Sequence, residues 1–443
     1  MSQLAAVLIL CFLIYGLGQL PRITKSNGVA AGFFTGVFYF IFPPLLYWLV
    51  RGTLFVYDFP LLGNMDINDF ESPLWMLLGY VLGMFFVLFL LRKPRRRKRA
   101  RPFMQAKKTK AVLPQPGGRH RQVVKYGIWV GTYFLVSLVV ISLSGVVQGG
   151  HWYRSRGEFL EQSGIFGVLL LFLIWGLRLL IVSYTFELLE HKAIGYPIAV
   201  VIGGAISGFE LRFVGNRIVI LMFGIAAAAF IVRRYGRLAL IGALGAAAPL
   251  GFVMAVYQDV RHLLFVVRTK EFISTLLVAA HARLSGAFWG TLLTVFEYAD
   301  FAILMKLFSM VGPQVAPLNG ATLLKVIIWP IPRGLLPAKP LPITVIVGNL
   351  FLPGRGVSLV PLFFGEIHYN FGVWGIFLSP FVLMAVFYFL DRIGNTLSFR
   401  FYWKFVLGFL LFRLPLSDMI VTAIFAWGVY KGTSLLVGSV VVP

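Results

Sequence analysis

The stretch "PLWMLLGYVLGMFFVLFLLRKPRRRKRAR", Pro73 to Arg101, joins an uninterrupted apolar run to a cluster of arginines and lysines. A helix needs about 20 apolar residues to cross a hydrocarbon core of about 30 Å, and the run 73–91 meets that requirement. From Arg92 to Lys125 the chain has fourteen Lys or Arg and no Asp or Glu. Cytoplasmic loops of membrane proteins carry such an excess of basic residues. The stretch therefore predicts a membrane-spanning helix followed by a basic cytoplasmic loop.

The composition of the whole chain agrees with this prediction. Of its 443 residues, 59% are hydrophobic and only 13% are charged, whereas soluble domains have about 45–50% apolar and about 25% charged residues. The formal net charge of +24 is concentrated in 92–125. This concentration favours a cytoplasmic loop that follows the positive-inside rule and contacts anionic lipid, and it argues against nucleic-acid binding. The single cysteine, Cys11, provides no disulfide framework. We expect an all-α polytopic membrane protein.

Apolar runs of similar character recur along the chain. They predict about eleven membrane-spanning helices, or thirteen if apolar segments between 258 and 372 enter the bilayer as a hairpin. The runs are 4–20, 29–50, 73–91, 126–147, 163–185, 196–209, 216–232, 238–257, 373–390, 400–412 and 419–440. The first run lacks the basic segment of a signal peptide, so we expect it to be a retained span. The organisation is three spans in 1–91, the basic loop 92–125, spans four to eight in 126–257, a large external loop with interfacial helices in 258–372, and C-terminal spans in 373–443.

Placing 92–125 in the cytoplasm assigns every other loop to a side, because successive spans alternate in direction. The N-terminus is then external and the C-terminus internal, and the other internal loops are short and mostly basic, as expected. These internal loops are "RITKS" (22–26), "EHK" (190–192), "RRYGR" (233–237) and "DRIGN" (391–395). The external side receives the acidic loop 58–72 and the polar segments 209–217, 258–372 and 413–418.

The external segment "IIWPIPRGLLPAKP" (327–340) places Arg333 and Lys339 among four prolines. Proline fixes φ and removes a backbone donor, so the segment is expected to be extended and ordered. Arginine offers a planar fork that binds phosphate through two hydrogen bonds. Cations at span ends also commonly extend to lipid headgroups and anchor the helix. Arg217, Arg355 and Arg413 are predicted on the same external face, and several cations on one face together with a carboxylate favour an anion-handling site.

The strongest candidate for acid–base chemistry is Glu366, in "PLFFGEIHYNFGVWG" (361–375). Its flanks are apolar, and desolvation would raise the pKa of the carboxyl toward the range of a general base. The alternative is a structural ion pair with a nearby arginine, which also perturbs a carboxyl. His368 is a weaker candidate, because a histidine at this position is more often a packing residue.

The motifs of nucleotide and metal enzymes are missing from the sequence. It contains no Walker sequence, no G-x-G-x-x-G that follows a strand, no H-E-x-x-H and no D-x-D pair. We therefore expect no metal and no cofactor. A reaction on the external face would need a donor that is already activated, and a lipid-linked diphosphate sugar meets that requirement.

Three short segments lie at predicted external span boundaries: "GNR" (215–217), "IPRGLLPAKP" (331–340) and "PLFFGEIHYNFGVWG" (361–375). In their order along the chain and their shared side, they resemble the Wzy-type oligosaccharide repeat-unit polymerases. Those enzymes build O-antigens, capsules and exopolysaccharides. The resemblance implies a metal-independent glycosyltransferase of GT-C-like architecture in the bacterial cytoplasmic (inner) membrane. Such an enzyme transfers a growing glycan from undecaprenyl diphosphate onto a lipid-linked repeat unit at the periplasmic face. A chain-length regulator and a flippase are its expected partners.

The resemblance also implies roles for individual residues. Arg217 and Arg333 would bind the diphosphate and stabilise its departure, helped by Lys339 and Arg413, because preorganised cations stabilise charge that develops on a leaving group. Glu366 would orient or deprotonate the acceptor hydroxyl. The residues expected at the acceptor glycan are Arg355, His368, Tyr369 and Asn370.

Other classes of protein share parts of this pattern. An O-antigen ligase would use the same external cations and carboxylate with another acceptor. A flippase of lipid-linked oligosaccharides predicts inverted repeats and polar residues in many spans; no repeat is evident, and Arg178, near the inner end of its span, is the main intramembrane charge. A structural subunit of an export complex would not need clustered external cations.

Overall fold

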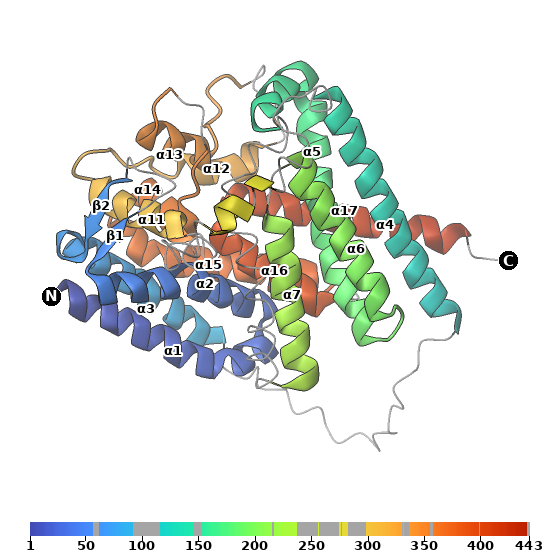
Figure 1. Cartoon of the computed structure of the whole chain (residues 1–443), viewed down its shortest axis with the longest axis horizontal. Helices are drawn as coiled ribbons and strands as arrows, with labels where there is room; N and C mark the ends of the chain where they lie inside the picture. The colour runs from blue at the N-terminus through green and yellow to red at the C-terminus, as the bar shows by residue number, and fades with distance from the viewer. Residues whose placement is uncertain are drawn as a thin grey trace.

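The computed structural model describes residues 1–55, 62–91, 116–144, 152–214, 217–236, 298–329, 336–354, 358–397 and 399–440, and a few single positions between 256 and 331. Within these ranges the chain is almost entirely helical (Figure 1). Nine of the described helices are long and apolar enough to cross a membrane. They are α1 (Ser2–Ser26), α2 (Gly28–Arg51), α3 (Glu71–Leu91), α4 (Pro116–Leu143), α5 (Trp152–Glu190), α6 (Tyr196–Phe209), α7 (Ile218–Tyr235), α15 (Trp374–Gly394) and α17 (Leu416–Val440). The prediction of an all-α polytopic membrane protein is confirmed.

Several predicted boundaries differ from the structure. Helix α4 begins at Pro116, inside the predicted loop 92–125, and its candidate span starts at His120. The predicted span 238–257 lies almost wholly outside the described residues. The predicted span 400–412 is a helix, α16 (Arg400–Arg413), but it is not a candidate span. Its 14 residues reach only about 21 Å, and every residue from 402 to 412 is buried by protein. A helix enclosed by protein does not need the length or hydropathy that lipid demands.

Helices α2 and α16 form the closest helix pair of the core. A Cβ atom added to Gly32 would lie 1.9 Å from the carbonyl oxygen of Phe405, and one added to Gly408 would lie 2.0 Å from that of Val29. Small residues let two helix backbones approach in this way. Phe33 of α2 lies beside this contact, with its ring centroid 5.4 Å from that of Phe412.

The shorter elements lie between 53 and 70 and between 298 and 371. The first region holds the antiparallel strands β1 (Thr53–Phe55) and β2 (Asn64–Asp66), and the 3-10 turn η2 (Ile67–Phe70). The second holds α11 (Tyr298–Met310), α12 (Ala321–Ile328), α13 (Ile343–Phe351) and α14 (Leu362–Phe371). Helices α11 and α14 are buried over most of their length. Part of the predicted external loop 258–372 therefore lies in the protein core.

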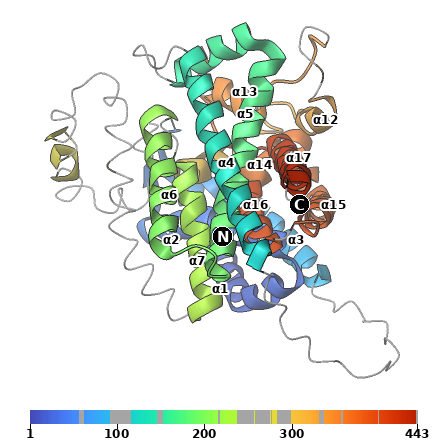
Figure 2. The ribbon, with the colours of Figure 1, turned by 90° about the vertical axis from the view of Figure 1, so that its right-hand side faces the viewer.

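The ends of the long helices gather at two ends of the molecule. At one end Glu190 accepts hydrogen bonds of 2.8 Å from Arg233 and from Tyr402, and Lys404 donates one of 2.7 Å to Asp391. We call this the basic end; it brings together the loops 190–192, 233–237 and 391–395, as far as they are described. Strands β1 and β2 lie with α11–α14 at the opposite end, which we call the hairpin end (Figure 1). Figure 2 shows α4, α5, α6 and α7 running side by side between the two ends.

A buried ion pair links three of these helices. Arg178 of α5 lies 2.6 Å from Oε1 of Glu210, and Tyr133 of α4 donates a hydrogen bond to the same carboxylate. Glu210 opens the π-helical turn η4 (Glu210–Val214) that continues α6. The candidate span Ser163–Glu190 places Arg178 near its middle, so the prediction of a position near the inner end is wrong. Helix packing pairs both charges inside the protein, where an unpaired charge would be costly.

Candidate functional site

The carboxyl of Glu366 is the meeting point of three helices. Its side chain, on α14, is 1% exposed. Oε2 accepts a hydrogen bond of 2.8 Å from the backbone N–H of Leu416, the first residue of α17. Oε1 accepts one of 3.2 Å from the hydroxyl of Thr322 on α12. Glu366 therefore joins α12 and the start of α17 to α14.

Asn370, one helical turn after Glu366, reinforces the same contact. Its amide Nδ2 donates to the hydroxyl of Thr322 at 2.6 Å and to the backbone carbonyl of Glu366 at 2.8 Å. Its Oδ1 accepts from the backbone N–H of Thr322 at 3.3 Å. These bonds orient the Thr322 hydroxyl toward Glu366, so Asn370 is a positioning residue in this structure.

An ion pair lies beside this carboxyl. Lys325, one turn along α12 from Thr322, lies 3.2 Å from Asp418 in the first turn of α17. Burial raises the pKa of Glu366 to about 7, and the nearby charge of Asp418 also raises it. The Leu416 N–H, the Thr322 hydroxyl and Lys325 act in the opposite direction and lower the pKa. The pKa of this carboxyl therefore lies near neutral pH, and its helix, α14, is not a candidate span.

Two predicted cations of the site have protein partners. The Nε of Arg413, at the end of α16, donates a hydrogen bond of 3.3 Å to Asp300 of α11, and both side chains are largely buried. Lys339 donates to the backbone carbonyls of Trp329 at 2.7 Å and of Ile331 at 2.8 Å. Lys339 therefore holds together the two sides of the proline-rich segment. Prolines have no backbone N–H to donate, and in this segment Lys339 supplies the donor for these two carbonyls.

The remaining predicted residues are placed differently. Arg217 is half-buried at the N-cap of α7, the end of that helix away from the basic end. Arg333 and Arg355 lie outside the described residues. Tyr369 is buried, and its backbone carbonyl accepts a hydrogen bond of 2.9 Å from Leu318. The predicted site is thus only partly assembled by the described residues, around Glu366 and Asn370.

His368 lies inside an aromatic cluster. Its side chain is 0% exposed, its Nδ1 lies 3.4 Å from the Tyr80 hydroxyl, and its ring centroid lies 4.7 Å from that of Phe308. Its Nε2 has no hydrogen-bond partner in the described part of the chain. Burial lowers the pKa of His368 to about 4. A neutral, enclosed imidazole fits a packing role better than a catalytic one.

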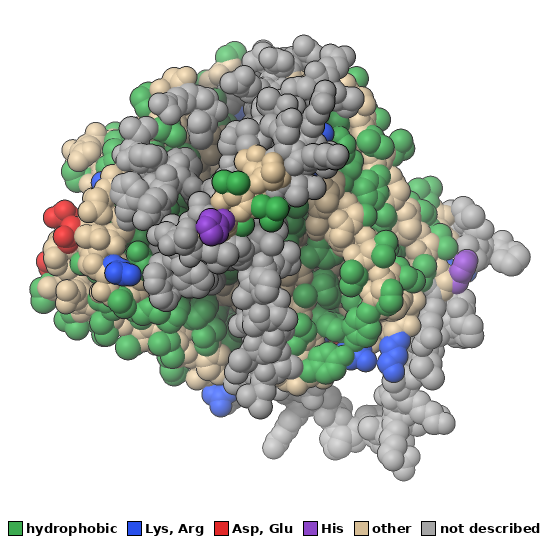
Figure 3. Space-filling model, in the orientation of Figure 1, with side chains coloured by type: hydrophobic (Ala, Val, Ile, Leu, Met, Phe, Trp, Pro, Cys, Tyr) green, Lys and Arg blue, Asp and Glu red, His purple; other side chains and the backbone are tan. Residues whose placement is uncertain are grey.

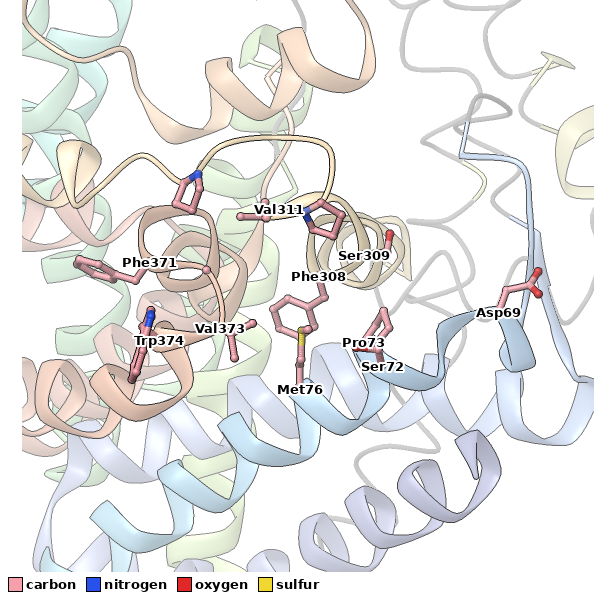
Figure 4. Close-up of a pocket in the computed structure, with 14 residues that line it drawn as sticks. Asp69, Ser72, Pro73, Met76, Phe308, Ser309, Val311, Phe371, Val373 and Trp374 are labelled. Carbon is pink, nitrogen blue, oxygen red and sulfur yellow. The ribbon is translucent and has the colours of Figure 1, made fainter.

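A cavity of about 540 Å³ opens at the hairpin end, between the start of α3, the end of α11 and the turn from α14 to α15 (Figure 4). Asp69 and Ser72 lie on one side of it, and Phe371 and Trp374 on the other. Phe308 lines the cavity and its ring contacts His368, whereas neither His368 nor Glu366 lines the cavity. The cavity combines a carboxylate, hydroxyls and aromatic rings, groups that suit a polar ligand with flat apolar faces.

Sequence reasoning missed Thr322 and Lys325. They lie in "ATLLKVII" (321–328), an apolar stretch within the predicted external segment 258–372. The only signal was a threonine and a lysine at i and i+3, on one face of an otherwise apolar stretch. In the described residues no group of three or more His, Cys, Asp or Glu side chains could hold a metal ion.

No family model, no curated protein and no solved structure matches this chain.

Proposed function

We propose that this protein is a glycosyltransferase that moves a growing glycan from undecaprenyl diphosphate onto a lipid-linked oligosaccharide repeat unit at the outer face of the cytoplasmic membrane. One observation carries the proposal: Glu366 is a buried carboxyl whose pKa is raised to about 7, beside the ion pair of Lys325 and Asp418. A general base works best when its pKa lies near the working pH. In the proposed reaction Glu366 takes the proton of the acceptor hydroxyl as that oxygen attacks the anomeric carbon.

The leaving diphosphate gains negative charge as the glycosidic bond breaks, and cations at the hairpin end would stabilise it. Lys325 lies one helical turn from Thr322, which bonds to Glu366, and its ion pair with Asp418 is partly exposed. An incoming diphosphate can therefore compete with Asp418 for Lys325. Arg413, paired with Asp300, is the next cation on the adjoining helix. Arg217 and Arg333 have the roles that the resemblance of their motifs implies.

Access to Glu366 requires movement of α12. This helix has eight residues, and it bonds to α14 through Thr322 and to α17 through the pair of Lys325 and Asp418. On its outer side Ile327 is 74% exposed. We propose that a diphosphate bound by Lys325 breaks the pair with Asp418, so that α12 separates from α17 and the acceptor reaches Glu366. Donor binding would then precede acceptor access.

A reconstituted reaction tests the proposal. Purified protein in lipid is supplied with native undecaprenyl-diphosphate repeat units, and products are resolved by length on a gel. The wild type should give a ladder of multiples. Glu366→Gln should reduce the rate by about 10²–10⁴-fold, the usual contribution of a general base. Glu71→Gln, an exposed carboxyl at the start of α3, is the matched control and should keep the ladder.

Two other results would redirect the proposal. Folded wild type that forms no ladder but translocates the lipid-linked substrate across a vesicle membrane would identify a transporter. Transfer to an added acceptor without chain growth would identify a ligase. A ladder that persists in Glu366→Gln would leave polymerisation standing and remove Glu366 from its chemistry.

A further inference from the structure

A small pocket of about 310 Å³ opens at the basic end, where α5 ends and α6 begins. Its lining contains two cations and no carboxylate. The lining residues are Leu189, Lys192, Ala193, Ile194, Gly195, Tyr196 and Arg234. The pocket is thus small, with a lining that is positively charged and partly apolar.

The two cations have no acidic partner in the described part of the chain, because the nearby carboxylates are bonded elsewhere. Glu190 accepts hydrogen bonds from Arg233 and from Tyr402. Glu187 is paired with His191 at 3.1 Å. The guanidinium of Arg234 instead faces the rings of Phe230 and Tyr235, at 5.8 Å and 5.7 Å from their centroids. Lys192 and Arg234 therefore leave a local excess of positive charge.

The backbone at Lys192 is unusual for a lysine. Its φ is 55°, in the left-handed region, and the turn is closed by a hydrogen bond of 2.8 Å from Ala193 N–H to the Leu188 carbonyl. Glycine or asparagine is preferred at this position of a helix end, and other residues are strained there. An outlier of this kind supports a functional hypothesis. The strained turn places an ammonium group at the pocket.

The start of α6 adds positive potential to the same pocket. Its N-cap is Gly195, which makes no side-chain capping bond. The helix dipole is positive at this end, and Pro197 in the first turn has no N–H to donate. Gly195 and Tyr196 both line the pocket. The field of the helix therefore acts together with the two side-chain cations.

We propose that this pocket binds the phosphate group of an anionic phospholipid. The apolar surface of α6 favours a lipid over free phosphate as the source of that group. Ile198 and Val201, on one face of α6 beyond the pocket, are 52% and 68% exposed, so an acyl chain can lie along them. Figure 3 shows Lys and Arg side chains at the lower right beside hydrophobic ones. Basic pockets between spans on the cytoplasmic side bind anionic headgroups in this manner.

Native mass spectrometry of the full-length protein tests this site. The protein, in mild detergent, is titrated with phosphatidylglycerol or with phosphatidylcholine, each with and without excess inorganic phosphate. Lys192→Asn with Arg234→Gln removes both cations, and asparagine suits the left-handed position, so the melting temperature should not fall. Arg22→Gln with Arg392→Gln removes the same charge from exposed residues outside the pocket and is the matched control.

The wild type should bind phosphatidylglycerol about tenfold more tightly than phosphatidylcholine, and only the Lys192/Arg234 variant should lose that difference. Excess inorganic phosphate should displace little of the bound phosphatidylglycerol. Equal binding by that variant and the control would overturn the site, and full displacement by inorganic phosphate would overturn the lipid as its ligand. Neither result depends on glycan transfer, so the two proposals fail separately.

Discussion

The backbone N–H of Leu416 donates a hydrogen bond of 2.8 Å to Oε2 of Glu366. Leu416 is the first residue of α17, so the carboxyl lies at the positive end of a helix, which favours its charged form. Burial favours the neutral form and is the larger influence, and the pKa of Glu366 therefore rises to about 7. The protonation of one buried side chain is thus coupled to the contact between α14 and α17.

The first prediction is a pH dependence of stability that Glu366 causes. Its folded pKa of about 7 lies above the ordinary 4.5, so the folded state holds this proton more tightly than the unfolded state. The stabilising contribution is complete below pH 4.5 and is lost as the pH rises to 7. Between pH 5 and pH 8 the free energy of unfolding of the wild type should fall by roughly 2–3 kcal/mol relative to Glu366→Gln. Denaturant unfolding of both proteins in detergent at pH 5 and at pH 8 measures this difference. The same change of unfolding free energy with pH in the wild type and in Glu366→Gln would contradict the prediction.

His368 should have an effect of opposite sign. Burial lowers its pKa from 6.5 to about 4, so its contribution is present above pH 6.5 and is lost as the pH falls to 4. The wild type should therefore lose about 2 kcal/mol of unfolding free energy between pH 8 and pH 5 because of this group. His368→Phe lacks the group, so this part of the loss should be absent from the variant. Because the ring is enclosed, the variant should also retain glycan transfer. A folded His368→Phe protein without transfer activity would return this residue to the site.

The pair of Arg178 and Glu210 predicts strong coupling in a double-mutant cycle. Arg178→Met leaves a buried carboxylate without its cation, and removal of one partner of a buried pair costs about 3–5 kcal/mol. The double variant Arg178→Met with Glu210→Leu should cost clearly less than the sum of the two single variants. Tyr133→Phe removes one donor to Glu210 and should cost about 1 kcal/mol. Additive free energies would show that the pair contributes no coupling.

The contact between α2 and α16 predicts a position-specific effect of alanine. A Cβ atom at Gly32 or at Gly408 would overlap a backbone carbonyl of the facing helix, so the two helices must move apart. We expect the free energy of unfolding of each Gly→Ala variant to fall by about 3 kcal/mol or more, since overpacking usually costs about 1–3 kcal/mol. Gly428→Ala, where a Cβ atom meets nothing within 4 Å, is the control. Thermal unfolding of the three variants decides the matter, and equal melting temperatures would contradict the packing.

Much of the architecture follows from the sequence, because the bilayer responds to local properties. Length and hydropathy of each run predicted the nine candidate spans that the structure describes. The apolar flanks of Glu366 correctly indicated a raised pKa. Both inferences depend only on residues that are neighbours in the chain.

The tertiary structure decided which groups meet. Glu366 bonds to Thr322 and Leu416, which are 44 and 50 residues away in sequence, and Arg178 pairs with Glu210, 32 residues away. The burial of α16 depends likewise on glycines of two helices that face each other. Such partners are set by the rotation, depth and crossing of packed helices, which local hydropathy does not encode. The sequence by itself determined that the chain is a bundle of membrane helices with a carboxyl in apolar surroundings, and only helix packing determined which partners tune that carboxyl.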